Sequence, residues 1–221
     1  MDQHSEPVTE PRRERRIDWT ATLRAAVLPL AVLGVILGGL WYWQGRGDTS
    51  IVRPAGTGIV ALPAERNPTG QSPSPTVGRA APDFILERPD GGRLRLSDLQ
   101  GHPVLVNFWA SWCPPCRAEA PELAAAYERY QADGLIVLGI DLQEADSKVT
   151  KFASKYGIAY PLVIDRDGQV ADTWRIGGPI KGLPMSYFVD RTGVIRAIYP
   201  GQLTNEVLAS RLAKILPGGS S

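Results

Sequence analysis

From residue 79 onward, short apolar runs are separated by clusters of glycine, proline and aspartate. Continuous apolar runs are typical of strands buried in a sheet, and apolar positions three and four residues apart are typical of helices. The runs predict strands over 84–86, 94–96, 104–109, 135–140, 162–164, 186–189 and 194–199. Helices are expected over 114–131, 149–156 and 169–175, and a last helix is expected after Thr204.

Turn residues and the order of these elements indicate the fold class. The segments 89–92 and 190–193 each join two predicted strands and have the composition of hairpin turns. Strands alternate with helices first, and a hairpin and a helix finish the chain. This order predicts an α/β domain over residues 79–218, with a mixed central sheet between helices.

An uncharged apolar run of 19 residues, 25–43, lies near the N-terminus. A helix of that length can cross the hydrocarbon core of a bilayer. Arginines precede the run at 12, 13, 15 and 16, and three aromatic residues, 41–43, close it. Arginines mark the cytoplasmic side of a span, and aromatic residues favour the interface. We therefore predict a signal anchor that spans the cell membrane once, with residues 1–24 in the cytoplasm and the rest of the chain outside it.

Two alternatives remain for the apolar run. A cleaved signal peptide would have a shorter apolar region ending in small residues, whereas this run ends in large aromatics. A helix buried in a protein core would not need such flanks. Residues 44–78 follow, and their abundance of Gly, Pro, Ser and Thr without an apolar period predicts a flexible linker.

Charge and cysteine content exclude several classes of function. The 24 Lys+Arg and 23 Asp+Glu residues nearly balance, which gives no indication of a nucleic-acid partner. Two cysteines are too few for a disulfide scaffold or for a closed zinc site, which needs four ligands. Arg117 follows the second cysteine, where covalent haem attachment would require histidine. We therefore expect neither a metal nor a cofactor.

The two cysteines, Cys113 and Cys116, lie where a predicted strand meets a predicted helix. At the N-cap of that helix the dipole favours the thiolate of Cys113, the form that attacks disulfides. Cys116 lies one turn further on the same side of the helix, so it can resolve the mixed disulfide. A permanent disulfide closing so short a loop would contribute little stability. The spacing therefore favours redox chemistry.

The residues between the cysteines bear on the direction of that chemistry. An N-cap anion accepts hydrogen bonds from the amides of the second and third helical residues. Pro115 occupies the second position and has no N–H, so only the Cys116 amide remains for Cys113. We expect a modestly lowered thiol pKa, which favours a reductant over a strong oxidant.

Three stretches of the chain resemble thioredoxin-like proteins of the TlpA/ResA type, which are anchored, exported disulfide reductases of the wider redoxin (AhpC/TSA-like) superfamily. They are Ala81–Phe84, Val106–Glu119 and Gly182–Asp190. The resemblance covers residues 79–216 and implies a thioredoxin-like fold. The helix and strand over 145–164 match the helix–strand insertion of that family.

The resemblance also implies roles for individual residues. Cys113 corresponds to the nucleophile, Cys116 to the resolving thiol, and Pro184 to a cis-proline beside the active site. Glu119 corresponds to a glutamate that manages protons, although its spacing alone suggests a solvated helix charge. Asn107 stands where thioredoxin has a buried aspartate, so proton transfer should shift to Glu119 or water. The expected substrate groove is formed by Trp112, Pro114, Pro115, Leu183 and Met185.

We therefore expect a membrane-anchored thiol–disulfide oxidoreductase that acts mainly as a disulfide reductase outside the cytoplasm. The resemblance implies oxidised apocytochrome c, in cytochrome c biogenesis, as the disulfide-containing substrate, and a membrane thiol donor of the CcdA/DsbD type. Three alternatives remain: a dithiol oxidase or isomerase, a peroxidase of the peroxiredoxin type, and an anchored binding module without catalysis. The Pro and Thr pattern that usually precedes a peroxiredoxin cysteine is absent.

Overall fold

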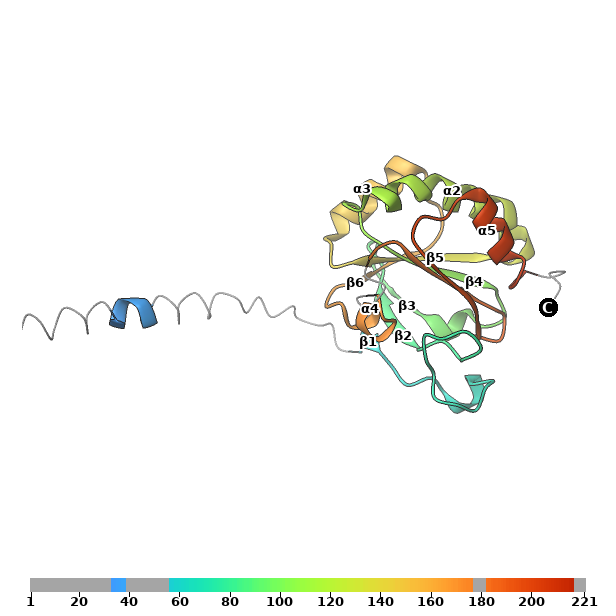
Figure 1. Cartoon of the computed structure of the whole chain (residues 1–221), viewed down its shortest axis with the longest axis horizontal. Helices are drawn as coiled ribbons and strands as arrows, with labels where there is room; N and C mark the ends of the chain where they lie inside the picture. The colour runs from blue at the N-terminus through green and yellow to red at the C-terminus, as the bar shows by residue number, and fades with distance from the viewer. Residues whose placement is uncertain (1–32, 39–55, 177–181, 217–221) are drawn as a thin grey trace, which may run out of the picture. The chain divides into compact units, whose positions relative to one another are not determined.

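The computed structural model describes residues 33–38, 56–176 and 182–216 (Figure 1). The chain divides into two compact units, residues 1–50 and 51–221. In the first unit, residues 33–38 are helical, and the rest of the predicted span 25–43 lies outside the described residues. Within the described residues, no helix has both the length and the apolar content that a membrane crossing requires. The signal anchor stays a prediction.

The second unit is built on an eight-stranded mixed sheet in the order β1-β2-β6-β5-β4-β7-β8, with β3 paired to β2. The strands are β1 (Gly58–Ile59), β2 (Phe84–Glu87), β3 (Arg93–Arg95), β4 (Val104–Trp109), β5 (Ile136–Leu142), β6 (Leu162–Asp165), β7 (Met185–Val189) and β8 (Ile195–Pro200). The central strands β4, β5 and β6 are parallel, and β7 and β8 continue antiparallel beside β4. All seven strands predicted from the sequence are present.

Helices cover both faces of this sheet, as predicted for the α/β fold (Figure 1). They are α2 (Pro114–Tyr130), α3 (Asp146–Tyr156), α4 (Gln169–Thr173) and α5 (Asn205–Leu212). The 3₁₀ turns are η1 (Ala64–Arg66), η2 (Leu96–Leu99) and η3 (Gln131–Asp133). One face carries α2, α3 and α5, and α4 packs on the other. Thr204 caps α5 through its hydroxyl, which accepts a hydrogen bond from the Val207 amide.

Side chains of β4 point alternately to the two faces of the sheet, and each face carries its own hydrophobic core. Leu105 and Trp109 join the core beneath α2, α3 and α5, whereas Val106 and Phe108 join the core around Trp174 on the opposite face. Successive side chains of a strand point to opposite faces. Asn107 therefore points towards α2, which places a polar group under the first turns of the helix that carries both cysteines.

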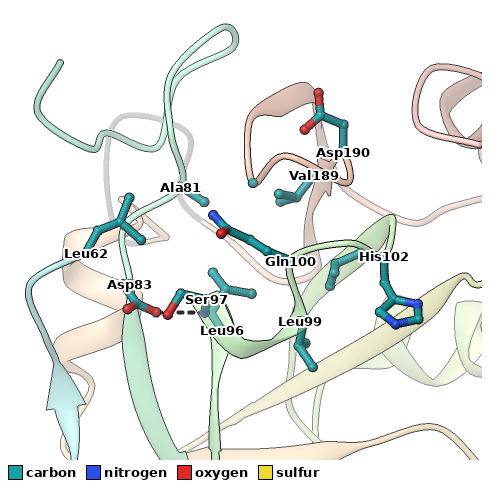
Figure 2. A pocket seen from close by; sticks show the side chains of 12 residues that line it. Leu62, Ala81, Asp83, Leu96, Ser97, Leu99, Gln100, His102, Val189 and Asp190 are labelled. Carbon is teal, nitrogen blue, oxygen red and sulfur yellow. Dashed lines mark hydrogen bonds between the residues drawn. The ribbon is translucent and has the colours of Figure 1, made fainter. Parts of the chain in front are cut away.

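The predicted linker 44–78 requires a correction, because its described part, 56–78, is folded onto the domain. β1 pairs with β2, and the Gly78 amide donates a hydrogen bond to the Ile195 carbonyl at 2.8 Å. Figure 2 shows Leu62 lining a small cavity of about 20 Å³ beside Asp83 and Gln100. Local composition indicated a linker without regular structure, because it carries no information about long-range backbone pairing.

Candidate active site

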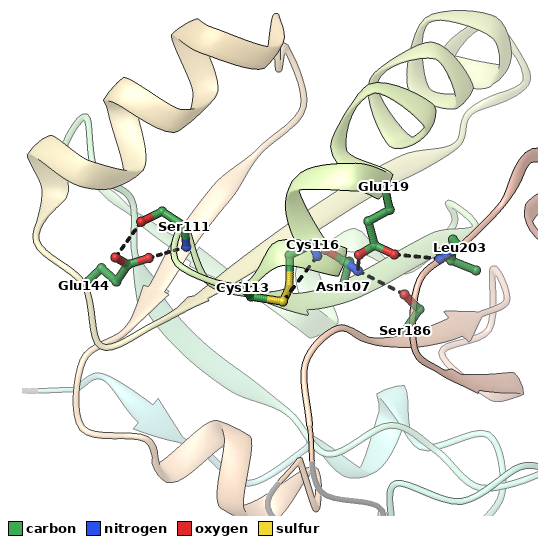
Figure 3. Close-up of a disulfide and its surroundings, with 8 residues drawn as sticks. All are labelled: Asn107, Ser111, Cys113, Cys116, Glu119, Glu144, Ser186 and Leu203. Carbon is green, nitrogen blue, oxygen red and sulfur yellow. Dashed lines mark hydrogen bonds between the residues drawn. A yellow bond between two sulfur atoms is a disulfide. The ribbon is translucent and has the colours of Figure 1, made fainter.

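The cysteine pair lies at the junction of β4 and α2 and is present as a disulfide (Figure 3). Cys113 is the N-cap of α2, and its Sγ accepts a hydrogen bond from the Cys116 amide at 3.2 Å. Pro114 and Pro115 form the first turn, so neither position has an N–H to donate. The expected single amide donor for Cys113 is confirmed.

Both cysteines are buried, and an exposed tryptophan precedes them. Cys113 and Cys116 are each 2% exposed, whereas Trp112 is 64% exposed. Tryptophan is one of the residues that most often contribute strongly to contacts between protein chains.

Leu183, in the segment before β7, packs against the hydrophobic core that includes both cysteines. The same segment contains the cis peptide bond Leu183–Pro184, as the resemblance implied. Leu183 and Trp112, two of the residues expected to form the substrate groove, line one groove of about 550 Å³. Met185 is a correction: its side chain is 3% exposed and packs in the core around Trp174. β7 begins at Met185 and pairs it with Phe108, so strand geometry directs its side chain into that core.

Glu119 and Asn107 form a buried polar network under the disulfide (Figure 3). Asn107 Nδ2 donates to Glu119 Oε1 at 2.8 Å and to Ser186 Oγ at 3.0 Å. The Leu203 amide donates to Glu119 Oε2 at 2.8 Å. Burial raises the pKa of Glu119 to about 7, although the hydrogen bonds from Leu203 and Asn107 oppose the rise.

This burial decides between the two interpretations of Glu119. Its side chain is 1% exposed, so the solvated helix charge suggested by spacing alone is wrong. A carboxyl group with a pKa near 7 exchanges protons readily at neutral pH. Glu119 can therefore accept or return a proton on the same helix that carries Cys116.

A second carboxylate site, which the sequence analysis missed, holds the loop just before the cysteines. Glu144 Oε2 accepts a hydrogen bond from the Ser111 amide at 2.5 Å, and its Oε1 accepts one from the Ser111 hydroxyl at 2.7 Å (Figure 3). Burial alone would raise the pKa of Glu144. The hydrogen bonds from Ser111 oppose this effect, and the net result is a pKa below the ordinary value. We call this contact the Ser111–Glu144 clasp.

Asp141 supports the clasp from the end of β5. Its Oδ1 accepts a hydrogen bond from the Glu144 amide at 3.0 Å. Burial, and after it the neighbouring Glu144 carboxylate, raise the pKa of Asp141 to about 8. The sequence analysis predicted both strands but not their pairing, and the structure shows that β4 and β5 are parallel neighbours. The carboxyl ends of parallel strands meet at one edge, which brings Asp141 and Glu144 near Ser111.

Within the described residues, no group of three or more His, Cys, Asp or Glu side chains is arranged to hold a metal ion. The arrangement around the disulfide instead combines two sulfur atoms, one amide donor and a buried carboxyl group. These groups are sufficient for thiol–disulfide exchange, because the dithiol itself carries two electrons.

Comparisons with known proteins agree with this chemistry. Residues 77–198 match the AhpC/TSA family. The thiol-disulfide oxidoreductase ResA of Geobacillus thermodenitrificans is 37% identical over 141 residues, covering 64% of this chain and 79% of the relative. ResA of Bacillus subtilis is 33% identical over 144 residues, covering 65% of this chain and 78% of the relative.

Solved structures with the same fold are also thiol–disulfide proteins. A thiol:disulfide interchange protein of the thioredoxin family from Chlorobium tepidum has a TM-score of 0.54 and 26% identity, covering 64% of this chain and 98% of that chain. A secreted thiol-disulfide isomerase from Corynebacterium glutamicum has a TM-score of 0.55 and 26% identity, covering 60% and 82%. With its thioredoxin-like fold and its cysteine pair at the start of α2, this chain belongs to the AhpC/TSA family and is a thiol–disulfide oxidoreductase of the ResA type.

Proposed function

We propose that this oxidoreductase works mainly as a reductant of disulfides in other proteins. The observation that carries the proposal is the single amide donor on Cys113, at 3.2 Å, since Pro115 has no N–H. Each additional donor would stabilise the thiolate and lower the thiol pKa. A less stabilised thiolate makes the reduced protein a better electron donor.

In the proposed reaction, the Cys113 thiolate attacks one sulfur of the substrate disulfide. A Cys113–substrate disulfide forms, and the other substrate sulfur leaves as a thiolate that takes up a proton. Cys116 then loses its proton and attacks Cys113 Sγ, which forms the Cys113–Cys116 disulfide and releases the second substrate thiolate, which is also protonated. The substrate gains two electrons and two protons, and the enzyme dithiol loses the same number of each and is oxidised to the disulfide.

Glu119 is proposed to accept the proton from Cys116 in the resolving step. Three features support this role: Glu119 lies three residues after Cys116 on α2, it is buried, and its pKa is about 7. Asn107 and Leu203 hold its two oxygens in place. Pro184 and Trp112 are proposed to orient the substrate chain beside the sulfur atoms.

The proposal places this domain outside the cytoplasm. The apolar run 25–43 with its preceding arginines supports a membrane anchor whose N-terminus is cytoplasmic. After each turnover the enzyme disulfide needs a reductant, and a membrane thiol donor of the CcdA/DsbD type would supply two electrons. Oxidised apocytochrome c, whose reduction serves cytochrome c biogenesis, is the proposed substrate.

The alternative is an isomerase that reshuffles disulfides, and one observation favours it. A similar solved structure is described as a secreted thiol-disulfide isomerase. The two functions differ in their redox potential, because an isomerase works near the balance between its dithiol and disulfide forms.

The deciding experiment measures the reduction potential of the protein equilibrated with glutathione or dithiothreitol. A potential near or below about −220 mV, towards the roughly −270 mV of thioredoxin, would support a reductant. A potential near about −120 mV, like that of DsbA, would overturn the proposal. Cys113→Ser should abolish reductase activity; a cellular function that survives this substitution would indicate a binding module.

A further inference from the structure

A basic groove lies beside the loop that leads to the cysteines. It has a volume of about 280 Å³ and lies between the start of α2 and the outer face of α3. Its lining residues are Ser111, Arg117, Lys148, Lys151, Phe152, Lys155 and Tyr156. We call it the α3 groove.

The cationic side chains of the α3 groove are concentrated on one helix face. Lys148, Lys151 and Lys155 are three of the five lysines in the whole chain, and α3 has only 11 residues. Residues three, four and seven apart lie on the same side of a helix, so the three ammonium groups form one stripe. Arg117 adds a fourth cation from α2.

These charges are poorly compensated within the protein. Lys148 approaches Glu144 at 3.9 Å, but Glu144 already accepts two hydrogen bonds from Ser111. The acidic residue that begins α3, Asp146, pairs with Arg166 at 2.7 Å instead. Among the described residues, no carboxylate lies within ion-pair distance of Arg117, Lys151 or Lys155. The groove therefore presents net positive charge to a ligand.

The floor of the groove is apolar and firmly packed. Phe152 is 6% exposed, and its ring lies 4.2 Å from that of Trp109 and 4.6 Å from that of Tyr156 (centroid distances). A hollow with an aromatic floor and cationic walls suits the side chains of an extended polypeptide better than a flat lipid surface. Ser111, at its rim, lies two residues before Cys113.

We propose that the α3 groove binds an acidic segment of the protein substrate and so holds the neighbouring substrate disulfide at Cys113. This inference rests on the proposed function, because it needs a polypeptide disulfide as substrate. Opposite charges accelerate diffusional encounter and fix the register of two chains more than they raise affinity. The effect should weaken at high salt, since exposed charges are screened.

The test compares two synthetic peptides that differ only in charge. Both contain one disulfide; four glutamates flank it in the acidic peptide and four glutamines in the neutral peptide. The reduced full-length chain in neutral detergent is mixed with each peptide at low salt, and the rate constant of exchange is measured by stopped flow. We expect the acidic peptide to react on the order of tenfold faster, and this preference to fall at high salt.

Two charge-matched variants locate the effect. The variant Lys148→Gln/Lys151→Gln/Lys155→Gln should lose most of the preference for the acidic peptide and keep its rate on the neutral peptide within about twofold. The control Arg129→Gln/Arg211→Gln/Lys214→Gln removes the same number of charges from the far end of α2 and from α5 and its C-terminal end, and should keep the preference. Arg117 stays unchanged in both, because it adjoins Cys116.

The outcomes separate this inference from the proposed function. Reduction of neither peptide would contradict the proposed function itself. Equal rates on both peptides, or equal losses in the two variants, would overturn the α3 groove as a docking site and leave the reductase proposal intact. Protection of the three lysines from acetylation in phosphatidylglycerol proteoliposomes, together with equal peptide rates, would assign the groove to lipid headgroups and also overturn the proposal.

Discussion

At the scale of single residues, Pro115 removes one hydrogen-bond donor from Cys113, because proline has no N–H. The Cys113 Sγ accepts one amide bond, from Cys116 at 3.2 Å, where an ordinary helix start would offer two. Hydrogen bonds to charged groups contribute about 1.5–3 kcal/mol, so one missing donor changes a thiol pKa by roughly one unit or more.

The first prediction follows from this missing donor. Pro115→Ala restores an N–H at the second helical position, and the Cys113 thiol pKa should fall by about one unit. The reduction potential should become more positive. The measurements are thiolate absorbance against pH and equilibration with glutathione. Pro114→Ala is the matched control, because an amide at the first helical position does not normally bond the N-cap side chain; an equal shift in both variants would contradict the argument.

The second prediction concerns the proton that leaves Cys116. Glu119 must be ionised to accept it, so the rate of the resolving step should rise with pH through about 7, the pKa of this buried carboxyl group. Glu119→Gln should remove that rise and slow resolution by about tenfold to a hundredfold at pH 8. Acid quenching followed by mass spectrometry gives the lifetime of the mixed disulfide.

An exposed glutamate on the same helix provides the control for that measurement. Glu128→Gln should leave the lifetime and its pH dependence unchanged. If Glu119→Gln slows the first attack by Cys113 as much as the resolving step, the residue supports the structure of the site and does not handle this proton.

At the scale of elements, the loop from β4 to α2 is held in place by hydrogen bonds to another loop, the one between β5 and α3. The Ser111–Glu144 clasp ties the residue before Trp112 to the loop between β5 and α3 through two hydrogen bonds, at 2.5 and 2.7 Å. Because Glu144 is a charged acceptor in a mostly buried position, both bonds are of the stronger class. The clasp therefore positions the start of α2 relative to the parallel strands.

The third prediction tests the clasp by a double-mutant cycle. Ser111→Ala and Glu144→Gln should each lower the free energy of unfolding by about 1–2 kcal/mol, because each weakens a charged hydrogen bond. The double variant should lose clearly less than the sum, since both substitutions break the same contact. Urea unfolding of the oxidised protein measures this, with the exposed Ser154→Ala on α3 as control; simple additivity would show that the two residues act independently.

At the scale of the whole molecule, buried carboxyl groups connect stability to pH. Burial raises the pKa of Glu119 to about 7, of Asp141 to about 8 and of Asp165 to about 6. A group with a raised pKa in the native state binds its proton more tightly there than in the unfolded chain. Stability is therefore lost as pH rises from the ordinary pKa, near 4, to the raised one.

The fourth prediction is that the free energy of unfolding falls by a few kcal/mol between pH 5 and pH 8. Each of the three groups contributes in the same direction, whereas Glu144 and Asp190, whose pKa values are lowered, act only below that window. Asp141→Asn should make the profile flatter, because it removes the largest of the three shifts. Urea unfolding at a series of pH values is the measurement, and a flat wild-type profile would contradict the prediction.

The residues that the sequence predicted well are those whose signal is local. Apolar runs located the strands, and the spacing of Cys113 and Cys116 located the redox pair, because each signal lies within a few neighbouring residues. Glu119 could not be placed by spacing, since a helix charge is buried or exposed according to what packs over it. The pairing of β1 with β2 depends on residues far apart in the chain, which composition does not encode.

The burial of the two sulfur atoms limits when a substrate protein can react with them. With Cys113 only 2% exposed behind a protruding Trp112, a rigid globular surface has little room to bring its own sulfur into contact. A flexible strand can thread past the indole, whereas a disulfide inside a finished fold stays out of reach. If the proposed reductase function holds, the enzyme would act on protein substrates before they fold, because folding would place their disulfides out of reach.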